Sequence, residues 1–234
     1  MRFTQIGITA KSVIEIMIID CIGCLHGYFP KLEGGDMLIV TGDLTARDSD
    51  KEHLDFVGWL SKQKYEKKIW IGGNHDNFLQ NTKFIPIIDI GLEYLCDSGT
   101  EFEGFKIWGS PWTPWFKQVN PRCKAFMKRD EELFETWGKI PHDTDILITH
   151  GPAYGILDGI PIEDGTLYHA GSHSLYNWIK YVERPRLHIF SHIHEAYGIE
   201  EHFPTYNDKM MKSINCSHVN ERYEPVNKPI RLIL

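Results

Sequence analysis

The 234-residue sequence lacks the features of several large classes of protein. Basic residues are not in excess, because the formal net charge is -7, so no surface is expected to follow the phosphates of a nucleic-acid duplex. The apolar stretch at residues 13–25 contains Glu15 and Asp20 and is too short to cross a bilayer. No signal-peptide pattern is apparent either. We therefore expect a soluble, cytoplasmic protein that does not bind a membrane.

The cysteines show no disulfide framework, because they are odd in number and irregularly spaced (Cys21, Cys24, Cys96, Cys123 and Cys216). Cys21 and Cys24 form a C-x-x-C pair, but no second pair is present to complete a zinc site. A redox role for the pair would require a thioredoxin-like βαβ context. Here the pair instead precedes His26 and Gly27. Reduced thiols, as in a cytoplasmic protein, are the simplest interpretation.

The sequence also has no internal repeat, low-complexity tract or linker, so we predict one domain over residues 1–234. Short runs rich in Ile and Val predict strands that are buried on both faces, at residues 13–19, 37–40, 69–71, 146–148 and 187–190. Ser49 and Glu52 form a capping-box pattern before a helix whose apolar residues are Leu54, Val57 and Leu60. A second helical pattern comprises Leu175, Trp178, Ile179 and Val182. This alternation predicts an α/β fold with a largely parallel sheet.

Polar residues of one chemical kind follow these predicted strands. Each motif is weak alone, but ligands collect beyond the carboxyl ends of strands in such sheets, and all the motifs fall there. The residues are His26, Asp43, Asn74, His75, His150, His192 and His194.

Imidazole, carboxylate and amide oxygen together suit Mn, Fe or Zn. Two such ions about 3.5–4 Å apart need a bridging carboxylate, and they can clamp a phosphoryl group and activate a water. Asp43 is the natural bridge, because it lies in a Gly-Asp turn at a strand end, and Asn74 suits a neutral oxygen ligand. His75 would meet the substrate, to stabilise the transition state or protonate the leaving oxygen, with Asp76 fixing its tautomer.

In order along the chain, these motifs resemble those of the calcineurin-like metallophosphoesterases, whose pattern is D-x-H, G-D, G-N-H-D/E, H and G-H-x-H. The sequence has Cys24-Leu25-His26, Gly42-Asp43, Gly73-Asn74-His75-Asp76, His150 and Ser191-His192-Ile193-His194. The stretches HGYFPKLEGGDMLIVTGDLTARD, GSPWTPWF, THGPAYGILD and HIFSHIHEAYG are similar to the small metallophosphoesterase-domain-containing subfamily, related to class III cyclic nucleotide phosphodiesterases. The similarity extends from about residue 16 to the C-terminus.

The resemblance implies a four-layer α/β/β/α sandwich with two central mixed sheets. It also implies a first metal held by His26, Asp43 and His194, and a second held by Asp43, Asn74, His150 and His192. His75 would be the acid, oriented by Asp76.

The sequence departs from the family pattern at two positions. Ser191 replaces the glycine of G-H-x-H, where its Cβ is expected to be tolerated or to crowd the phosphate or a ligand. Cys24 replaces the first aspartate. Three interpretations of Cys24 stay open: a ligand that shifts the metal preference, a non-coordinating residue that leaves a weak first site, or a gap filled by Asp20. The simplest alternative is a small buried hydrophobic residue.

The prediction for function is a metal-dependent phosphoesterase, a phosphodiesterase rather than a monoesterase, with cyclic nucleotides as the first substrates to consider. The alternative is a degenerate member that binds metal or nucleotide as a sensor or scaffold. Trp112, Trp115 and Tyr154 either line a base-binding cleft or simply pack. His169, His173 and His188 are interpreted as structural or surface residues. The sequence makes no prediction of the oligomeric state.

Overall fold

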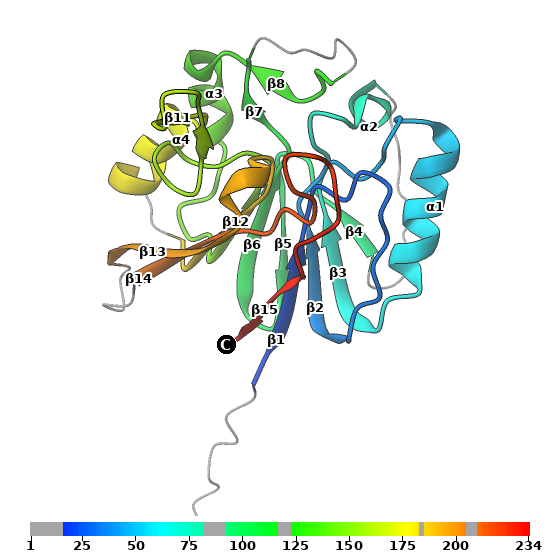
Figure 1. Cartoon of the computed structure of the whole chain (residues 1–234). Helices are drawn as coiled ribbons and strands as arrows, with labels where there is room; N and C mark the ends of the chain where they lie inside the picture. Colours follow the sequence, from blue (N-terminus) through cyan, green and yellow to red (C-terminus); the bar gives the residue numbers. More distant parts are fainter. Residues whose placement is uncertain (1–15, 82–91, 117–122, 183–184, 205–209) are drawn as a thin grey trace, which may run out of the picture.

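The structure is a computed structural model, and it describes residues 16–81, 92–116, 123–182, 185–204 and 210–234. Two mixed β-sheets face one another at its centre (Figure 1). The strands of the first sheet lie in the order β15-β1-β2-β3-β4, in which only the β1–β15 pair is antiparallel. Their bounds are β1 Ile18–Ile22, β2 Gly35–Val40, β3 Tyr65–Trp70, β4 Leu92–Tyr94 and β15 Ile230–Ile233.

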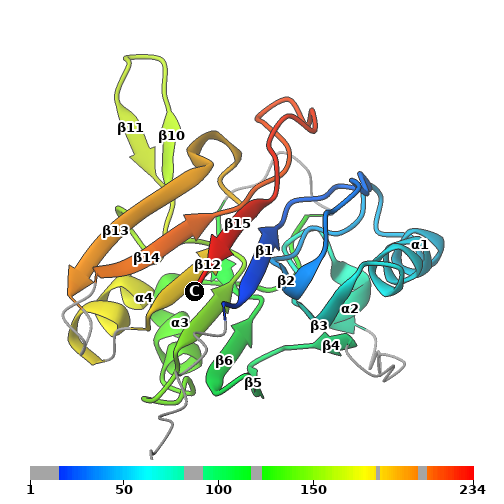
Figure 2. The ribbon, with the colours of Figure 1, turned by 90° about the horizontal axis from the view of Figure 1, so that it is seen from below.

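The second sheet has the order β13-β14-β12-β9-β6-β5, with antiparallel pairs only at its two edges. Its strands are β5 Ser98–Phe102, β6 Phe105–Ser110, β9 Ile146–Thr149, β12 Leu187–Phe190, β13 Gly198–Pro204 and β14 Met210–Asn215. Two short pairs lie outside both sheets: β7 Thr113–Pro114 with β8 Met127–Lys128, and β10 Gly159–Pro161 with β11 Leu167–His169. The β10–β11 hairpin projects from the body of the molecule (Figure 2).

Helices cover the outer face of each sheet, which gives the four layers that the resemblance implies (Figure 2). Those on the first sheet are α1 Asp50–Ser61 and α2 Asn77–Asn81. Those on the second are α3 Asp130–Trp137, α4 His173–Asn177 and the π-helical turn η1 Trp178–Val182, and a 3₁₀ turn, η2 His194–Ala196, follows β12. No helix of the described residues is long and apolar enough to cross a membrane.

The strands alternate their side chains between two apolar layers, as period-two geometry requires. Ile19 and Ile39 of the first sheet and Ile148 and Ile189 of the second belong to the core between the sheets. Their strand neighbours face outward, as Leu38 does in the core under α1. The strands are therefore buried on both faces, as their composition predicted.

Two sequence predictions need correction in detail. The capping box at Ser49 is confirmed, but Leu54 is 65% exposed, and the buried residues of α1 are His53, Phe56 and Leu60. The first strand begins at Ile18 and runs to Ile22, later than predicted; residues 13–15 of that prediction lie outside the described residues.

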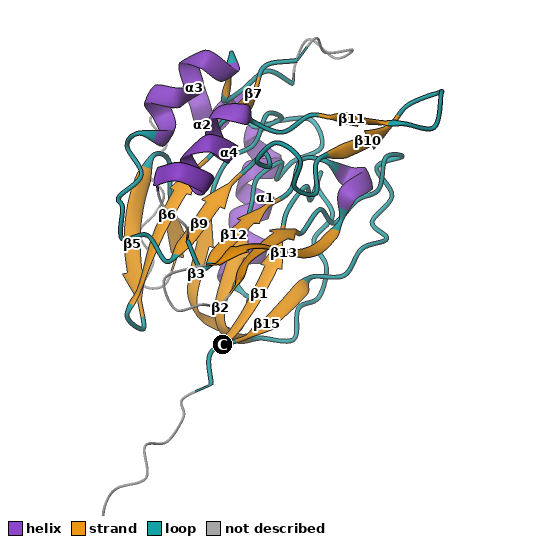
Figure 3. Cartoon of the chain, turned by 90° about the vertical axis from the view of Figure 1, so that its left-hand side faces the viewer, coloured by secondary structure: helices purple, strands orange, loops and turns teal. Residues whose placement is uncertain are grey.

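The loops that follow the parallel strands gather at one end of both sheets (Figure 3). Backbone hydrogen bonds join these loops across the molecule. The amide of His26 donates to the carbonyl of Asp43, and the amide of Ser191 donates to the carbonyl of His150. This end of the sandwich carries the candidate site.

Candidate metal centre

The structure brings together the predicted metal ligands, which come from strand ends of both sheets. Cys24 and His26 follow β1, Asp43 follows β2 and Asn74 follows β3. His150 follows β9 directly, and His192 and His194 follow β12. Donor atoms within 4.8 Å of one another form three groups here: Cys24–His26–His194, His26–Asp43–His75 and Asp43–His150–His192.

Asp43 lies between the two sides of this cluster and turns one carboxylate oxygen to each. Its Oδ2 is 3.7 Å from Nε2 of His26. Its Oδ1 is 3.4 Å from Nε2 of His150. A carboxylate with donor groups on both of its oxygens has the placement that a bridge between two ions requires.

On the first side, Cys24, His26 and His194 are gathered around Oδ2 of Asp43. The Nε2 atom of His26 is buried and has no hydrogen-bond partner in the described part of the chain. A buried polar atom is costly unless it is paired, so this orphaned nitrogen fits a metal ligand. The ring of His194 lies edge-on to those of His26 and Tyr223, with centroid distances of 5.3 Å to each.

On the second side, His150 is fully buried between Asp43 and Asn74. Its Nδ1 is 2.8 Å from the backbone carbonyl of Thr41, and because a carbonyl can only accept, Nδ1 carries the hydrogen. Its Nε2 is 2.9 Å from Oδ1 of Asn74, an amide oxygen that can also only accept. Burial alone would lower the pKa of His150, but the charge of Asp43 raises it. A histidine held by a carbonyl on its other nitrogen is the usual arrangement of a metal-bound imidazole.

The backbone is unusual at four of these residues. Cys24, His26, Asp43 and His192 have φ values of 46°, 44°, 53° and 73°, in the left-handed region that residues with a Cβ rarely adopt. Such strain persists only where the surrounding structure fixes it, and it gathers at functional sites.

Burial keeps three of the imidazoles neutral, which is the form that binds metal. It lowers the pKa of His26 to about 3 and that of His194 to about 4, and it lowers the pKa of His192 well below its usual value. Burial alone would raise the pKa of Asp43, but His150 and His75 hold it well below the usual range. The Asp43 carboxylate is therefore ionised.

Cys24 is fully buried, and its sulfur faces polar groups. The backbone N–H of His192 donates to its Sγ at 3.1 Å. Burial, followed by the charge of Asp43, raises the pKa of the Cys24 thiol well above its usual value. Asp20 does not fill the place of the missing carboxylate, because it forms an ion pair with Arg231 (2.7 Å) and accepts a hydrogen bond from Tyr65.

His75 lies at the edge of the cluster, where its amide donates to Oδ1 of Asp43 at 2.9 Å. The structure differs from the expectation for Asp76, whose carboxylate accepts hydrogen bonds from the amides of Asp43 and Gly73 (2.9 and 2.8 Å). The atom beside Nδ1 of His75 is instead Sγ of Cys123, at 3.3 Å. Asp76 thus supports the loop of Asp43, and Cys123 contacts the imidazole.

Ser191, the other departure from the family pattern, does not crowd the site. Its Oγ accepts a hydrogen bond from Oγ1 of Thr41 (2.8 Å) and lies within 3.1 Å of the Thr41 carbonyl. Space for the side chain exists because residue 23 is glycine: a Cβ on Gly23 would lie 2.6 Å from Oγ of Ser191.

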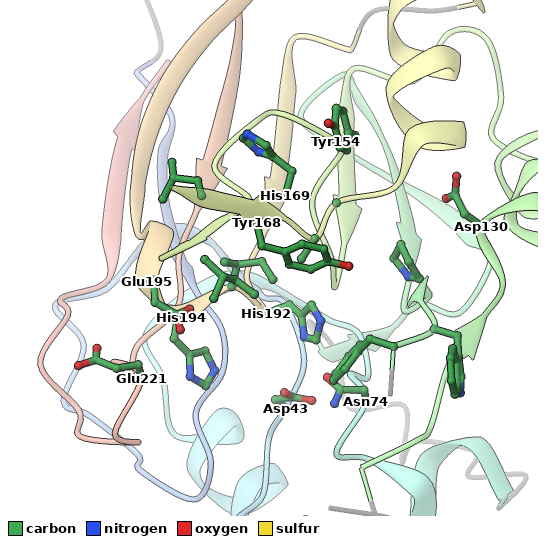
Figure 4. Close-up of a pocket in the computed structure, with 18 of the residues that line it drawn as sticks. Asp43, Asn74, Asp130, Tyr154, Tyr168, His169, His192, His194, Glu195 and Glu221 are labelled. Atoms are coloured by element: carbon green, nitrogen blue, oxygen red, sulfur yellow. The ribbon is translucent and has the colours of Figure 1, made fainter. Parts of the chain in front are cut away.

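A cleft of about 790 Å³ opens over the cluster (Figure 4). Asp43, Asn74, His75, His192 and His194 lie at its base. Its walls include Trp115, Phe116, Tyr154, Tyr168, His169 and His173, and acidic residues Asp130, Glu195 and Glu221 also line it. Two of the three aromatic residues considered from sequence therefore line the cleft, whereas Trp112 packs against the apolar cores.

Several residues at the site were missed or misjudged from sequence. His169 and His173 line the cleft, and the Tyr154 and His173 rings stack 3.7 Å apart. Tyr223 packs 4.8 Å from the ring of His26. Cys123 and Tyr223 belong to no strand-end motif, so no local signal identified them. Of the three histidines interpreted from sequence as structural or surface residues, His188 is the one that is fully buried.

Comparison with known proteins supports the assignment that this geometry suggests. Residues 17–196 match the family model described as calcineurin-like phosphoesterase. The chain belongs to the calcineurin-like phosphoesterase family. The human and mouse proteins named metallophosphoesterase domain-containing protein 1 are each 35% identical over 220 residues. That similarity covers 84% of this chain and 64% of theirs, so the chain spans less than two thirds of these relatives.

Solved structures agree with this family in fold. A protein from Thermus thermophilus matches with a TM-score of 0.55 at 14% identity, covering 86% of this chain and 89% of its own. The purple acid phosphatase PPD1 from yellow lupin seeds matches with a TM-score of 0.51 at 12% identity, covering 94% of this chain and 49% of its own. The chain is therefore an α/β protein of the metallophosphoesterase fold, with buried His and Asp groups suited to divalent metals.

Proposed function

We propose that this calcineurin-like phosphoesterase is a hydrolase that uses two divalent ions and prefers phosphodiesters. The observation that carries the proposal is the placement of Asp43, with Oδ2 toward His26 and Oδ1 toward His150. His75 lies beside that carboxylate and lines the cleft. A site that only stored metal would have no need for an imidazole on the substrate side.

In this proposal the two sides of the cluster hold one ion each. Cys24, His26, Asp43 and His194 would hold the first, and Asp43, Asn74, His150 and His192 the second. Manganese, iron or zinc would supply Lewis acidity to the phosphoryl oxygens and lower the pKa of the attacking water.

The protein's own contribution is to position groups and move a proton. Asp43 accepts the amide of His75 and so fixes the backbone that carries the imidazole. Nε2 of His75, 3.9 Å from Oδ2 of Asp43, is partly exposed to the cleft. From there it would donate a proton to the leaving oxygen as the bond to phosphorus breaks. Cys123, on the opposite nitrogen, limits rotation of the ring.

The charge of the cleft supports a diester as substrate. None of the described residues that line it is Lys or Arg, and four are acidic: Asp43, Asp130, Glu195 and Glu221. A phosphomonoester carries close to two negative charges at neutral pH, whereas a diester carries one. An acidic cleft therefore disfavours the monoester more strongly.

The aromatic walls suit a substrate with a flat ring, which is why cyclic nucleotides stay the first candidates. Trp115 is 59% and Tyr168 57% exposed, so both present apolar surface to a ligand. The choice of nucleotide rests on the subfamily resemblance and these aromatic groups together.

The rival function is a degenerate family member that binds metal or nucleotide without turnover. The observation that favours it is Cys24, a buried thiol in the place of a carboxylate. The hydrolysis experiment described next separates the two functions.

The test is hydrolysis of an aryl phosphodiester and the matching monoester with added Mn²⁺. The native protein is compared with His75→Ala, Cys24→Asp and a matched control, His202→Ala, whose side chain pairs with Glu200 on β13 outside the cleft. We expect diester turnover that falls on the order of 10²-fold or more in His75→Ala and is unchanged in His202→Ala. If Cys24→Asp hydrolyses the diester and the native protein does not, the rival function replaces this proposal.

A further inference from the structure

The two sides of the metal cluster offer different donor atoms. The first side has a sulfur, two imidazole nitrogens and a carboxylate oxygen, from Cys24, His26, His194 and Asp43. The second has only nitrogen and oxygen donors, from Asp43, Asn74, His150 and His192. Ligand softness decides which ions a site prefers, so the two sides differ chemically.

We propose that the first side is a thiolate site for a zinc-class ion, with Cys24 Sγ as a ligand, so that the two sides differ in metal preference. This inference rests on the two-ion centre of the proposed function but not on hydrolysis. When the ion binds, a sulfur–metal bond forms and the thiol proton passes to solvent.

The surroundings of Cys24 are those of a ligand and not of a core residue. Cys21, three residues earlier, belongs to the apolar core between the sheets, whereas Cys24 belongs to none of the three apolar clusters of the described residues. Its sulfur lies within 4.8 Å of donor nitrogens of His26 and His194. A thiol that merely filled space would be expected among aliphatic side chains.

Hydrogen bonds to the sulfur of Cys24 also support its role as a ligand. The backbone N–H of His192 can only donate, so Sγ of Cys24 is the acceptor in their 3.1 Å contact. The hydroxyl of Ser217 also lies near the sulfur, at 3.9 Å. Donors directed at sulfur stabilise the thiolate form, as they do for other anionic acceptors.

A second, independent observation is the orphaned nitrogen of His26. Its Nε2 is buried and lacks a hydrogen-bond partner among the described residues, and His26 belongs to the same group of donors as the sulfur and His194. Together with Asp43 these groups provide four donors, the usual number for zinc, and thiolate and imidazole are its usual ligands. Manganese prefers oxygen donors and is better served by the second side.

The test uses Co²⁺ as a spectroscopic probe, because a cobalt–thiolate bond gives a near-ultraviolet charge-transfer band that nitrogen and oxygen ligands do not. The full chain is stripped with a chelator, and Co²⁺ is titrated into the native protein, Cys24→Asp, Cys24→Ser and Cys123→Ser. Cys123→Ser is the matched control, since its buried thiol lies 3.3 Å from Nδ1 of His75. We expect a band that saturates with one equivalent in the native protein and the control, and no band in either Cys24 variant.

A metal-competition measurement gives a second readout. With equal Zn²⁺ and Mn²⁺ and removal of excess ions, elemental analysis should find a higher ratio of zinc to manganese in the native chain than in Cys24→Asp, because that change replaces the soft sulfur ligand by a hard oxygen ligand. Cobalt binding without a sulfur band, or a band that survives in Cys24→Asp, would overturn the inference. A native protein that shows the band but no hydrolysis would refute the proposed function and support the thiolate site. A native protein that hydrolyses the diester but shows no band would support the proposed function and refute the thiolate site.

Discussion

Gly73 provides the sharpest structural test of the metal centre, because its missing side chain makes room for two ligands. A Cβ at this position would lie 2.3 Å from Oδ1 of Asp43, 2.5 Å from Cε1 of His150 and 2.6 Å from the Asp43 amide nitrogen. The last of these is backbone, so no rotamer change relieves all three overlaps. Gly73→Ala must therefore displace the bridging carboxylate, the imidazole or both.

The expected size of the effect follows from these distances. Ordinary contact begins at about 3.4 Å, so Oδ1 of Asp43 would have to retreat by about 3.4 − 2.3 = 1.1 Å. Misplacement of a reacting group by 1 Å costs activity on the order of 10²-fold. Overpacking of a buried site costs about 1–3 kcal/mol of unfolding free energy.

The measurements are turnover of the aryl diester, metal content and the free energy of unfolding. The matched control is Gly58→Ala, since a Cβ on Gly58 meets no heavy atom within 4 Å. In the middle of α1, that change should stabilise the protein by about 0.5–1 kcal/mol and leave turnover unaltered. A Gly73→Ala protein with native metal content and turnover would refute the assigned arrangement of Asp43 and His150.

Two further predictions concern Cys123 and His188. Cys123→Ala should lower kcat about fivefold with little change in KM, because His75 loses a contact at Nδ1 that is worth about 1 kcal/mol. The same change should alter the pH profile of turnover, and Cys123→Ser should restore activity. An unchanged pH profile would exclude a role of Cys123 in positioning the His75 ring. Burial lowers the pKa of His188 to about 3, so the unfolded chain binds a proton that the folded one lacks, and stability falls as the pH drops below about 6.5. Between about pH 6 and about pH 4.5, the metal-free native protein should lose about 2 kcal/mol more unfolding free energy in urea than His188→Gln, and equal losses would contradict this assignment.

The positions of the ligands could be predicted from sequence because the rule that places them is local. Each follows an apolar run, and parallel strands bring their carboxyl ends to one edge. The position of His150 could be predicted from the end of β9 at Thr149 alone, because His150 is the next residue. The capping box at Ser49 is equally local and was also predictable.

Features that depend on distant partners could not be predicted. His53 is a polar residue, which favours an exposed position on a helix. It is nevertheless buried in α1, because it pairs with Asp48 (2.9 Å) and stacks on Phe78. Asp20 interrupts an apolar stretch of sequence, but Arg231, far along the chain, supplies its charge partner. The register of β1 and the buried face of α1 follow from these tertiary contacts, which override local pattern.

The same limit explains the error over Asp76 and the omission of Cys123. Asp76 follows His75 in sequence, which suggested a contact, but its carboxylate accepts backbone amides from the neighbouring loop. Cys123 is 48 residues from His75 and carries no motif. One domain over residues 1–234, a cytoplasmic location and manganese as a working ion stay predictions.

The most direct test of the account is the metal content of the native protein and of Asp43→Ala, measured by elemental analysis after equilibration with Zn²⁺ and Mn²⁺. Asp43 turns an oxygen to each side of the cluster, so its loss should weaken both ions together. We predict two ions per native chain and fewer than one in Asp43→Ala, with diester turnover lost in parallel. A native chain that binds at most one ion, or an Asp43→Ala protein that keeps two, would contradict the two-metal centre.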